Sequence, residues 1–253
     1  MLSNTRTSNT VPVREGVAPS RRALLRTAVA GTAAAGSVLA LGSAFPASAA
    51  PPAPGGAGRP ATPEQALREL EAGNRRWRTY RQQHPHESPS TRLRLATAQH
   101  PFAVVLGCVD SRVPPELVFD QGLGDLLTVR SAGEVLDEAV LGSIAYGVLE
   151  LAIPLVLVLG HQSCGAVGAA VHADETGERL PSHIQYLADQ IRPSIDRTQH
   201  GDARVSATID AHARRTRDRL AAEPDLARAV SAGALAVAAA RYDLRDQRVR
   251  ILT

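Results

Sequence analysis

Three short apolar runs in the middle of the chain continue without polar interruption. They span residues 103–107, 126–129 and 155–159. Residues 137–151 instead place their apolar side chains three and four positions apart, which is the period of an amphipathic helix. Strands that are apolar at every position are typical of parallel sheets, because helical crossovers cover both faces. The pattern predicts an α/β domain with a mostly parallel central sheet flanked by helices.

The flanking regions predict an N-terminal helical arm and one more strand. Thr62-Pro63-Glu64-Gln65 combines an N-cap, a first-turn proline and a glutamine at the third helical position. We expect Gly73-Asn74 to interrupt the apolar face of the helix that begins there. Residues 183–240, including their Ala-rich end, are expected to be mostly helical, and residues 249–252 to form the last strand.

The first 49 residues have the features of an export signal. Ser20-Arg21-Arg22-Ala23-Leu24-Leu25-Arg26 resembles a twin-arginine motif, an uncharged apolar stretch follows, and Ala47-Ser48-Ala49 is an A-x-A cleavage pattern. We expect residues 1–49 to be a cleaved signal peptide read by the twin-arginine translocase, with a retained membrane anchor as the alternative. Residues 50–61 are then a Pro/Gly/Ala-rich linker and residues 62–253 the domain. The protein would act outside the cytoplasm, secreted or in the cell envelope.

Most of the positive charge lies in that segment. The whole chain has a formal net charge of +3, and residues 1–49 hold five arginines and one glutamate. Subtracting their +4 leaves −1 for residues 50–253. This balance indicates no nucleic-acid partner.

The chain has two cysteines, and each follows a predicted strand. Cys108 comes after the run 103–107, and His161 and Cys164 come after the run 155–159. The carboxyl ends of parallel strands meet at one edge of a sheet, so these three side chains are expected to converge. A disulfide is the alternative for an exported protein. Twin-arginine export carries proteins that are already folded, which favours a zinc site loaded in the cytoplasm.

Asp110 and Arg112 lie beside the first cysteine and leave two arrangements open. Asp110 is a candidate fourth ligand that would close the site and make it structural. Alternatively, Arg112 holds the Asp110 carboxylate in a bidentate pair and leaves the fourth position to water. Spacing alone does not decide between these two states.

The motifs together resemble the β-class carbonic anhydrases. The resemblance rests on five segments and extends over essentially all of the domain: Cys108-Val-Asp-Ser-Arg-Val-Pro-Pro-Glu116, Phe119-Asp-Gln-Gly122, Gly124-Asp-Leu126, Val129-Arg-Ser-Ala-Gly133 and Gly160-His-Gln-Ser-Cys-Gly-Ala-Val167. It departs from the family at Ser131, where an asparagine is usual.

This resemblance implies reversible hydration of CO2 to bicarbonate and a proton, through a hydroxide held on one Zn2+ per chain. Cys108, His161 and Cys164 would bind the zinc, with Asp110 and Arg112 as the catalytic pair. It also implies a homodimer or a higher even homo-oligomer. Three further positions match substrate-binding residues of the family, namely Gln99 acting across the dimer interface and Leu127 and Ala132 in the apolar pocket wall.

Two other functions fit the same residues. One is hydrolysis of COS or CS2 on the same scaffold. The other is a noncatalytic zinc-binding or redox-sensing protein, in which Asp110 closes the site or Cys108 and Cys164 oxidise. The histidines other than His161, among them His172 and His212, are expected at the surface.

Overall fold

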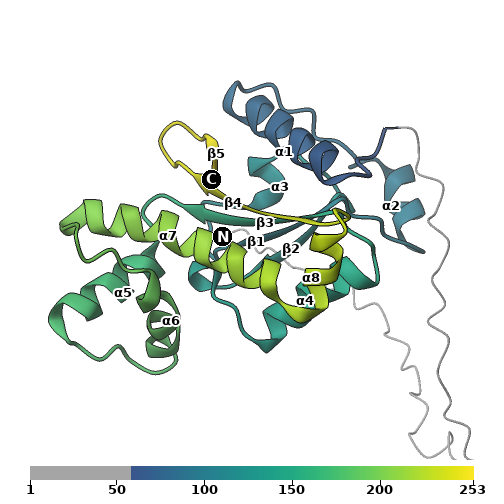
Figure 1. Cartoon of the computed structure of the whole chain (residues 1–253). Coiled ribbons are helices and arrows are strands. Elements are labelled where there is room, and N and C mark those ends of the chain that lie inside the picture. The colour runs from purple at the N-terminus through teal and green to yellow at the C-terminus, as the bar shows by residue number, and fades with distance from the viewer. Residues whose placement is uncertain (1–57) are drawn as a thin grey trace, which may run out of the picture. The chain divides into compact units, whose positions relative to one another are not determined.

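A five-stranded sheet forms the centre of the computed structural model, which describes residues 58–253 (Figure 1). The strands lie in the order β2-β1-β3-β4-β5. The predicted signal peptide, residues 1–49, and most of the linker, residues 50–61, lie outside the described residues. The strands are β1 (Ala103–Gly107), β2 (Leu126–Arg130), β3 (Leu155–His161), β4 (Ala236–Tyr242) and β5 (Val249–Leu252).

Parallel pairing joins the first four strands, and β5 pairs antiparallel with β4. Val105 of β1 lies opposite Thr128 of β2 on one side and Leu157 of β3 on the other. The chain therefore has the predicted fold class, an α/β domain with a mostly parallel sheet. All residues of β1 and β3 are buried, as their uninterrupted apolar pattern predicts.

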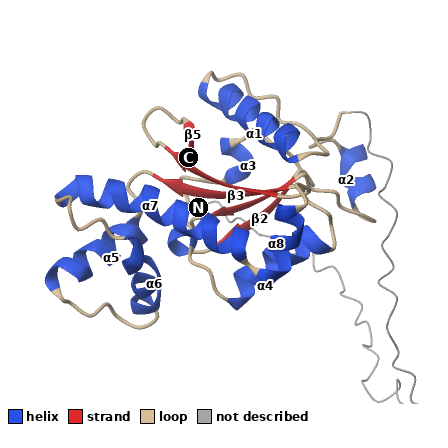
Figure 2. Cartoon of the chain, viewed as in Figure 1, coloured by secondary structure: helices blue, strands red, loops and turns tan. Residues whose placement is uncertain are grey.

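Helices cover both faces of the sheet (Figure 2). Helices α1 and α3 lie on one face, whereas α4, α7 and α8 lie on the other. The helices are α1 (Pro63–Arg78), α2 (Pro89–Leu95), α3 (Pro115–Val118), α4 (Glu138–Leu149), α5 (Gly165–Thr176), α6 (Ile184–Ile191), α7 (Gly201–Ala222) and α8 (Pro224–Ser231), with 3₁₀ turns η1 (Ala132–Glu134) and η2 (Arg192–Ser194). None of the helices within residues 58–253 is both long and apolar enough to cross a membrane.

The sheet separates two apolar cores. Val104 and Leu106 of β1 pack on the side of α4 and α7, whereas Val105 packs on the side of α1 and α3. Successive side chains of a strand point to opposite faces, so a strand between two helical layers needs apolar residues throughout. This two-layer burial holds the carboxyl ends of β1 and β3 in place.

Helix α1 begins as predicted and continues through Gly73-Asn74. Thr62 accepts a hydrogen bond from the Gln65 amide as N-cap, and the helix continues to Arg78. Gly73 is buried in its interior, where a Cβ atom would lie 1.7 Å from the Phe119 carbonyl oxygen. The glycine interrupts the row of apolar side chains because it serves close packing of α3 on α1.

The Ala-rich end of the predicted helical region is strand β4. Residues 236–242 pair with β3 along its whole length, from Leu155↔Ala236 to His161↔Tyr242. Alanine favours helices in isolation, but a place between two strands overrides that weak preference. Small side chains also suit this position, since Ala239 and Ala240 are fully buried in the two cores.

Candidate metal centre

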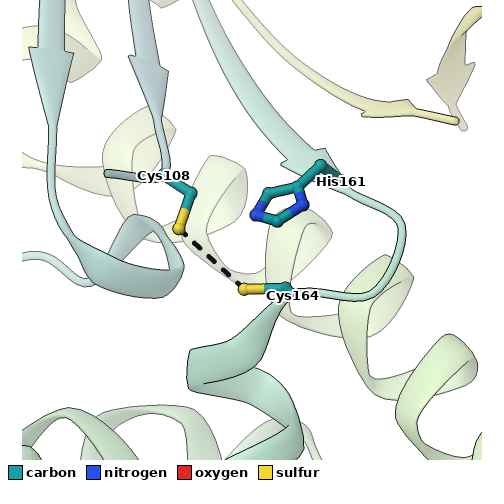
Figure 3. Close-up of side chains that lie close together, drawn as sticks. All are labelled: Cys108, His161 and Cys164. Atoms are coloured by element: carbon teal, nitrogen blue, oxygen red, sulfur yellow. Dashed lines mark hydrogen bonds between the residues drawn. The ribbon is translucent and has the colours of Figure 1, made fainter. Parts of the chain in front are cut away.

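Cys108, His161 and Cys164 meet at the carboxyl edge of the sheet (Figure 3). Cys108 follows β1, and His161 is the last residue of the neighbouring strand β3. Cys164 is the N-cap residue of α5, reached by a turn in which Ser163 has a φ of 56°. Parallel pairing of β1 with β3 brings together residues that are more than fifty positions apart in the sequence.

The positions of the three ligand atoms fit one metal ion. These atoms all lie within 4.8 Å of one another, and the two sulfur atoms are 4.0 Å apart. Two thiolates at about 2.3 Å from one tetrahedral zinc ion would be separated by about 3.8 Å. All three residues are buried. Two sulfurs and one imidazole are a donor set that suits zinc.

His161 presents one nitrogen to this centre. Its Nδ1 lies 2.9 Å from the Gln162 carbonyl oxygen, which can only accept, so Nδ1 carries the proton. Nε2 is buried and has no hydrogen-bond partner within residues 58–253. A buried nitrogen lone pair without a donor is costly unless a ligand satisfies it. This atom is therefore oriented as a metal ligand, with its tautomer set by the backbone.

The two cysteine sulfurs lie within hydrogen-bond distance of each other. A hydrogen bond from Cys164 lowers the pKa of Cys108, against the opposing effect of burial. The same hydrogen bond, together with burial, raises the pKa of Cys164. The hydrogen bond thus favours the thiolate form of Cys108, and binding of a metal ion would release the protons of both thiols.

Arg112 holds the Asp110 carboxylate beside the three candidate ligands. Its Nε lies 2.9 Å from Oδ1, its Nη2 lies 2.7 Å from Oδ2, and its backbone amide also donates to Oδ1 at 2.9 Å. Asp110 Oδ2 remains 3.9 Å from His161 Nε2. The hydrogen bonds from the Arg112 side chain lower the pKa of Asp110 to about 2. Of the two arrangements open from sequence, the structure shows the paired one.

Comparisons with known proteins agree with this site. A carbonic anhydrase family model matches residues 103–249. Carbonic anhydrase 2 of Mycobacterium tuberculosis is 42% identical over 188 residues, which are 74% of this chain and 91% of that protein. The carbonic anhydrase of Mycolicibacterium smegmatis is 41% identical over 191 residues, 75% of this chain and 93% of that protein.

The chain belongs to the carbonic anhydrase family. Its fold is that of the β-carbonic anhydrases. The prediction that it is an enzyme is confirmed, because its relatives are carbonic anhydrases. The β-carbonic anhydrase CcaA has a TM-score of 0.60 at 21% identity, covering 73% of this chain and 94% of that one. A tetrameric β-carbonic anhydrase of Sordaria macrospora has a TM-score of 0.60 at 20% identity, covering 74% of this chain and 96% of that one.

The predicted substrate residues of this carbonic anhydrase family member lie on three different parts of the fold. Gln99 is exposed and lines a hollow of about 540 Å³ with Leu95 and Leu123. Leu127 is half-buried on β2 and packs against the core on the α4 side. Ala132 lies in η1, directly before Gly133. Of these three residues, only Ala132 adjoins a residue that contacts a candidate ligand, because Gly133 donates to the Cys108 sulfur.

The last residue of β2 and the turn after it support Cys108, a role that the sequence did not reveal. Arg130 donates from Nε to the Cys108 carbonyl at 2.8 Å and from Nη2 to the Asp110 carbonyl at 2.6 Å. Gly133 donates its backbone N–H to the Cys108 sulfur at 3.3 Å. Glu134 is buried nearby, and burial raises the pKa of its carboxyl group well above the usual value. The end of β2 thus contacts the backbone of the first cysteine, and the following turn contacts its sulfur.

His212 was expected at the surface and is instead 2% exposed. Its burial is difficult to predict from sequence, because α7 has many polar residues and only a weak apolar stripe. One available signal was spacing, since Thr208, His212 and Thr216 recur every four residues and all three are buried. A histidine in such a stripe faces the fold and not the solvent.

Proposed function

We propose that this protein is a zinc enzyme that reversibly hydrates CO2 to bicarbonate and a proton. One observation carries the proposal: two thiols and one imidazole converge on a buried point, and a carboxylate clamped by arginine lies at its edge. Cys108, His161 and Cys164 would hold one Zn2+ per chain. Bound zinc would supply Lewis-acid activation of a water molecule at neutral pH.

Asp110 would act as a hydrogen-bond acceptor that orients the attacking water. A carboxylate with a pKa of about 2 is a poor base at neutral pH, so it stays ionised and accepts a hydrogen bond without keeping the proton. A hydrogen bond from the water to the Asp110 carboxylate would direct the lone pair of the water oxygen toward the carbon of CO2. Orienting the water in this way lowers the activation barrier of its attack on CO2, because the entropy of ordering it is lost before the reaction.

Arg112 would keep Asp110 available for that task. Both of its donors point at the carboxylate, and they hold Oδ2 3.9 Å from His161 Nε2. Without the arginine, the carboxylate would be free to move onto the metal as a fourth ligand and exclude water. The charge-assisted pair therefore supports an open site and not a structural one.

The test is stopped-flow CO2 hydration by the purified full chain, with zinc measured on the same sample. We expect rapid hydration with about one zinc per chain. Hydration should be lost in Asp110→Ala and Arg112→Ala proteins that keep their zinc. Asp174→Ala is the matched control, because Arg197 holds Asp174 with the same two-point geometry on an exposed surface.

Full zinc content without CO2 hydration would contradict the proposal. The next substrates would then be COS and CS2, which the same activated water could attack. Failure with all three would leave a noncatalytic zinc or redox protein, consistent with the 4.0 Å separation of the two thiols. A protein that binds no zinc would exclude all of these functions except a redox role of the two cysteines.

We also propose that residues 1–49 export the protein through the twin-arginine translocase. The paired Arg21-Arg22 and the Ala47-Ser48-Ala49 pattern support this proposal. The mature N-terminus, determined on protein recovered outside the cytoplasm, should be Ala50. Arg21→Lys/Arg22→Lys should retain the protein inside the cell. Export of that double variant at the wild-type level would contradict the assignment.

Finally, we propose a homodimer or a higher even homo-oligomer. Strand β2 is an edge strand with half-buried residues, and the neighbouring Leu123 is 49% exposed. Gln99 shares a hollow with Leu123, so a second chain seated here would bring it toward a partner's site. Light scattering should give at least twice the chain mass. A monomer with full activity would contradict both the assembly and a role for Gln99 across it.

A further inference from the structure

His212 is a buried imidazole that the proposed mechanism does not use. It is a buried residue of α7, the long helix labelled in Figure 1, and both of its ring nitrogens have partners. Nδ1 is 3.2 Å from the Ser194 hydroxyl, and Nε2 is 2.8 Å from the Gly133 carbonyl oxygen. Because a buried polar ring is costly without partners, this arrangement defines a single orientation of the ring.

The partners also define the tautomer. The Gly133 carbonyl can only accept, so Nε2 carries the proton and donates it. Nδ1 is then the acceptor, and the Ser194 hydroxyl donates to it. Burial lowers the pKa of His212 to about 4, so the ring stays neutral at physiological pH.

Gly133 connects this histidine to the metal centre. Its carbonyl receives the His212 proton, while its amide N–H donates to the Cys108 sulfur at 3.3 Å. The residue has a φ of 65°, and a Cβ here would lie 2.9 Å from the Ile191 side chain and 3.1 Å from that of Ala166. Only a glycine fits a left-handed conformation this closely packed. Gly133 is therefore contacted at its carbonyl by His212 of α7 and lies close to side chains of α5 and α6.

We propose that His212 is a positioning residue for the metal centre. It acts through Gly133, whose N–H group it holds toward the Cys108 sulfur. This inference rests on the proposed zinc site. A hydrogen bond to a thiolate withdraws charge from the sulfur and fixes its direction, and such supporting contacts tune metal affinity. Loss of the His212 donor would free the Gly133 carbonyl, and the backbone rotation that this allows about the Gly133 Cα atom would displace the N–H group and weaken its hydrogen bond to the sulfur.

The test compares His212→Leu, which removes the donor, with His212→Gln, whose side-chain amide can donate near the position of Nε2. His172→Gln is the matched control, because His172 is an exposed helical histidine on α5. Zinc affinity is measured by competition with a chelator. The thiolate-to-metal charge-transfer absorption is measured on the cobalt-loaded full chain, because this band reports charge on the sulfur independently of turnover.

We expect His212→Leu to weaken zinc binding by about 10-fold and to shift the charge-transfer band. His212→Gln should restore most of both, and His172→Gln should match the wild type. A folded His212→Leu protein with wild-type affinity and an unchanged band would overturn the inference.

A second variant covers the case in which His212→Leu does not fold. Ser194→Ala removes the donor to Nδ1 and so frees the ring to turn away from the Gly133 carbonyl, which should shift the cobalt band in the same direction. An unchanged band in Ser194→Ala would then overturn the inference. Failure of the wild-type protein to bind zinc is a separate result, since it would refute the proposed function before any variant is compared.

Discussion

Arg112 contacts both carboxylate oxygens of Asp110, with Nε 2.9 Å from Oδ1 and Nη2 2.7 Å from Oδ2. The two residues are separated by one position, so this fork closes over a single turn of the chain. A planar guanidinium matches a carboxylate at two points, whereas an ammonium group supplies one compact charge. The relationship between the two side chains is therefore geometric as well as electrostatic.

Arg112→Lys should lower CO2 hydration by about 10-fold or more although the positive charge remains. A lysine cannot hold both oxygens, so Asp110 would sample positions that no longer orient the attacking water. The measurement is kcat/KM by stopped flow at full zinc occupancy. Arg197→Lys, which alters the equivalent fork on Asp174, should leave activity unchanged. Equal activity of wild type and Arg112→Lys would refute the need for two-point contact.

Added zinc should raise the Tm of the wild-type protein and not that of Cys164→Ser. A ligand that binds only the folded state stabilises it in proportion to the logarithm of its concentration over Kd. Serine keeps the size of the side chain but is a far weaker zinc ligand than a thiolate. Calorimetry with and without zinc measures the effect, and a chelator should reverse it in the wild type. A zinc-dependent Tm increase in Cys164→Ser equal to that of the wild type would exclude Cys164 as a ligand.

Gly73→Ala should destabilise the fold by about 3 kcal/mol or more, because the new methyl group overlaps the Phe119 carbonyl. The structure leaves 1.7 Å between that carbonyl oxygen and an added Cβ. Gly142→Ala on α4 is the control, since nothing lies within 4 Å of its Cβ position. That substitution should stabilise by roughly 0.5–1 kcal/mol through helix propensity. Urea unfolding of both variants gives the comparison, and similar stabilities would contradict the packing of α3 on α1.

Stability should fall as the pH drops from about 6.5 to about 4, through His212. Burial lowers the pKa of this histidine in the folded state to about 4, with smaller contributions from Arg215 and Arg219. The unfolded state therefore binds a proton in this range and the folded state does not, so the contribution of His212 is complete above pH 6.5 and is lost below it. The full effect is about 3 kcal/mol.

The measurement is the free energy of unfolding at a series of pH values, for wild type and His212→Gln. A glutamine does not titrate, so the variant should lose this part of the pH dependence. His172→Gln, on the exposed face of α5, should keep it. Parallel curves for wild type and His212→Gln would show that His212 titrates with an ordinary pKa.

The amino-acid sequence by itself determined the elements whose signals are local. Uninterrupted apolar runs marked β1, β2 and β3, and Thr62 with Pro63 marked the start of α1. The rule that parallel strands end at one edge then predicted that Cys108 and His161 meet. These inferences succeeded because side-chain periodicity and strand polarity are properties of the chain that need no knowledge of its neighbours.

Tertiary structure alone decided the features that depend on contacts between distant segments. The Ala-rich residues 236–242 became a strand because β3 offered a pairing edge, and Gly73 stayed helical because Phe119 packs against it. His212 became a buried link to Cys108 only through the fold of α7 over η1. Arg112 beside Asp110 was readable from spacing, but its hold on the carboxylate depended on side-chain geometry. Local pattern determines which residues can form an element, whereas packing determines which partner each side chain meets.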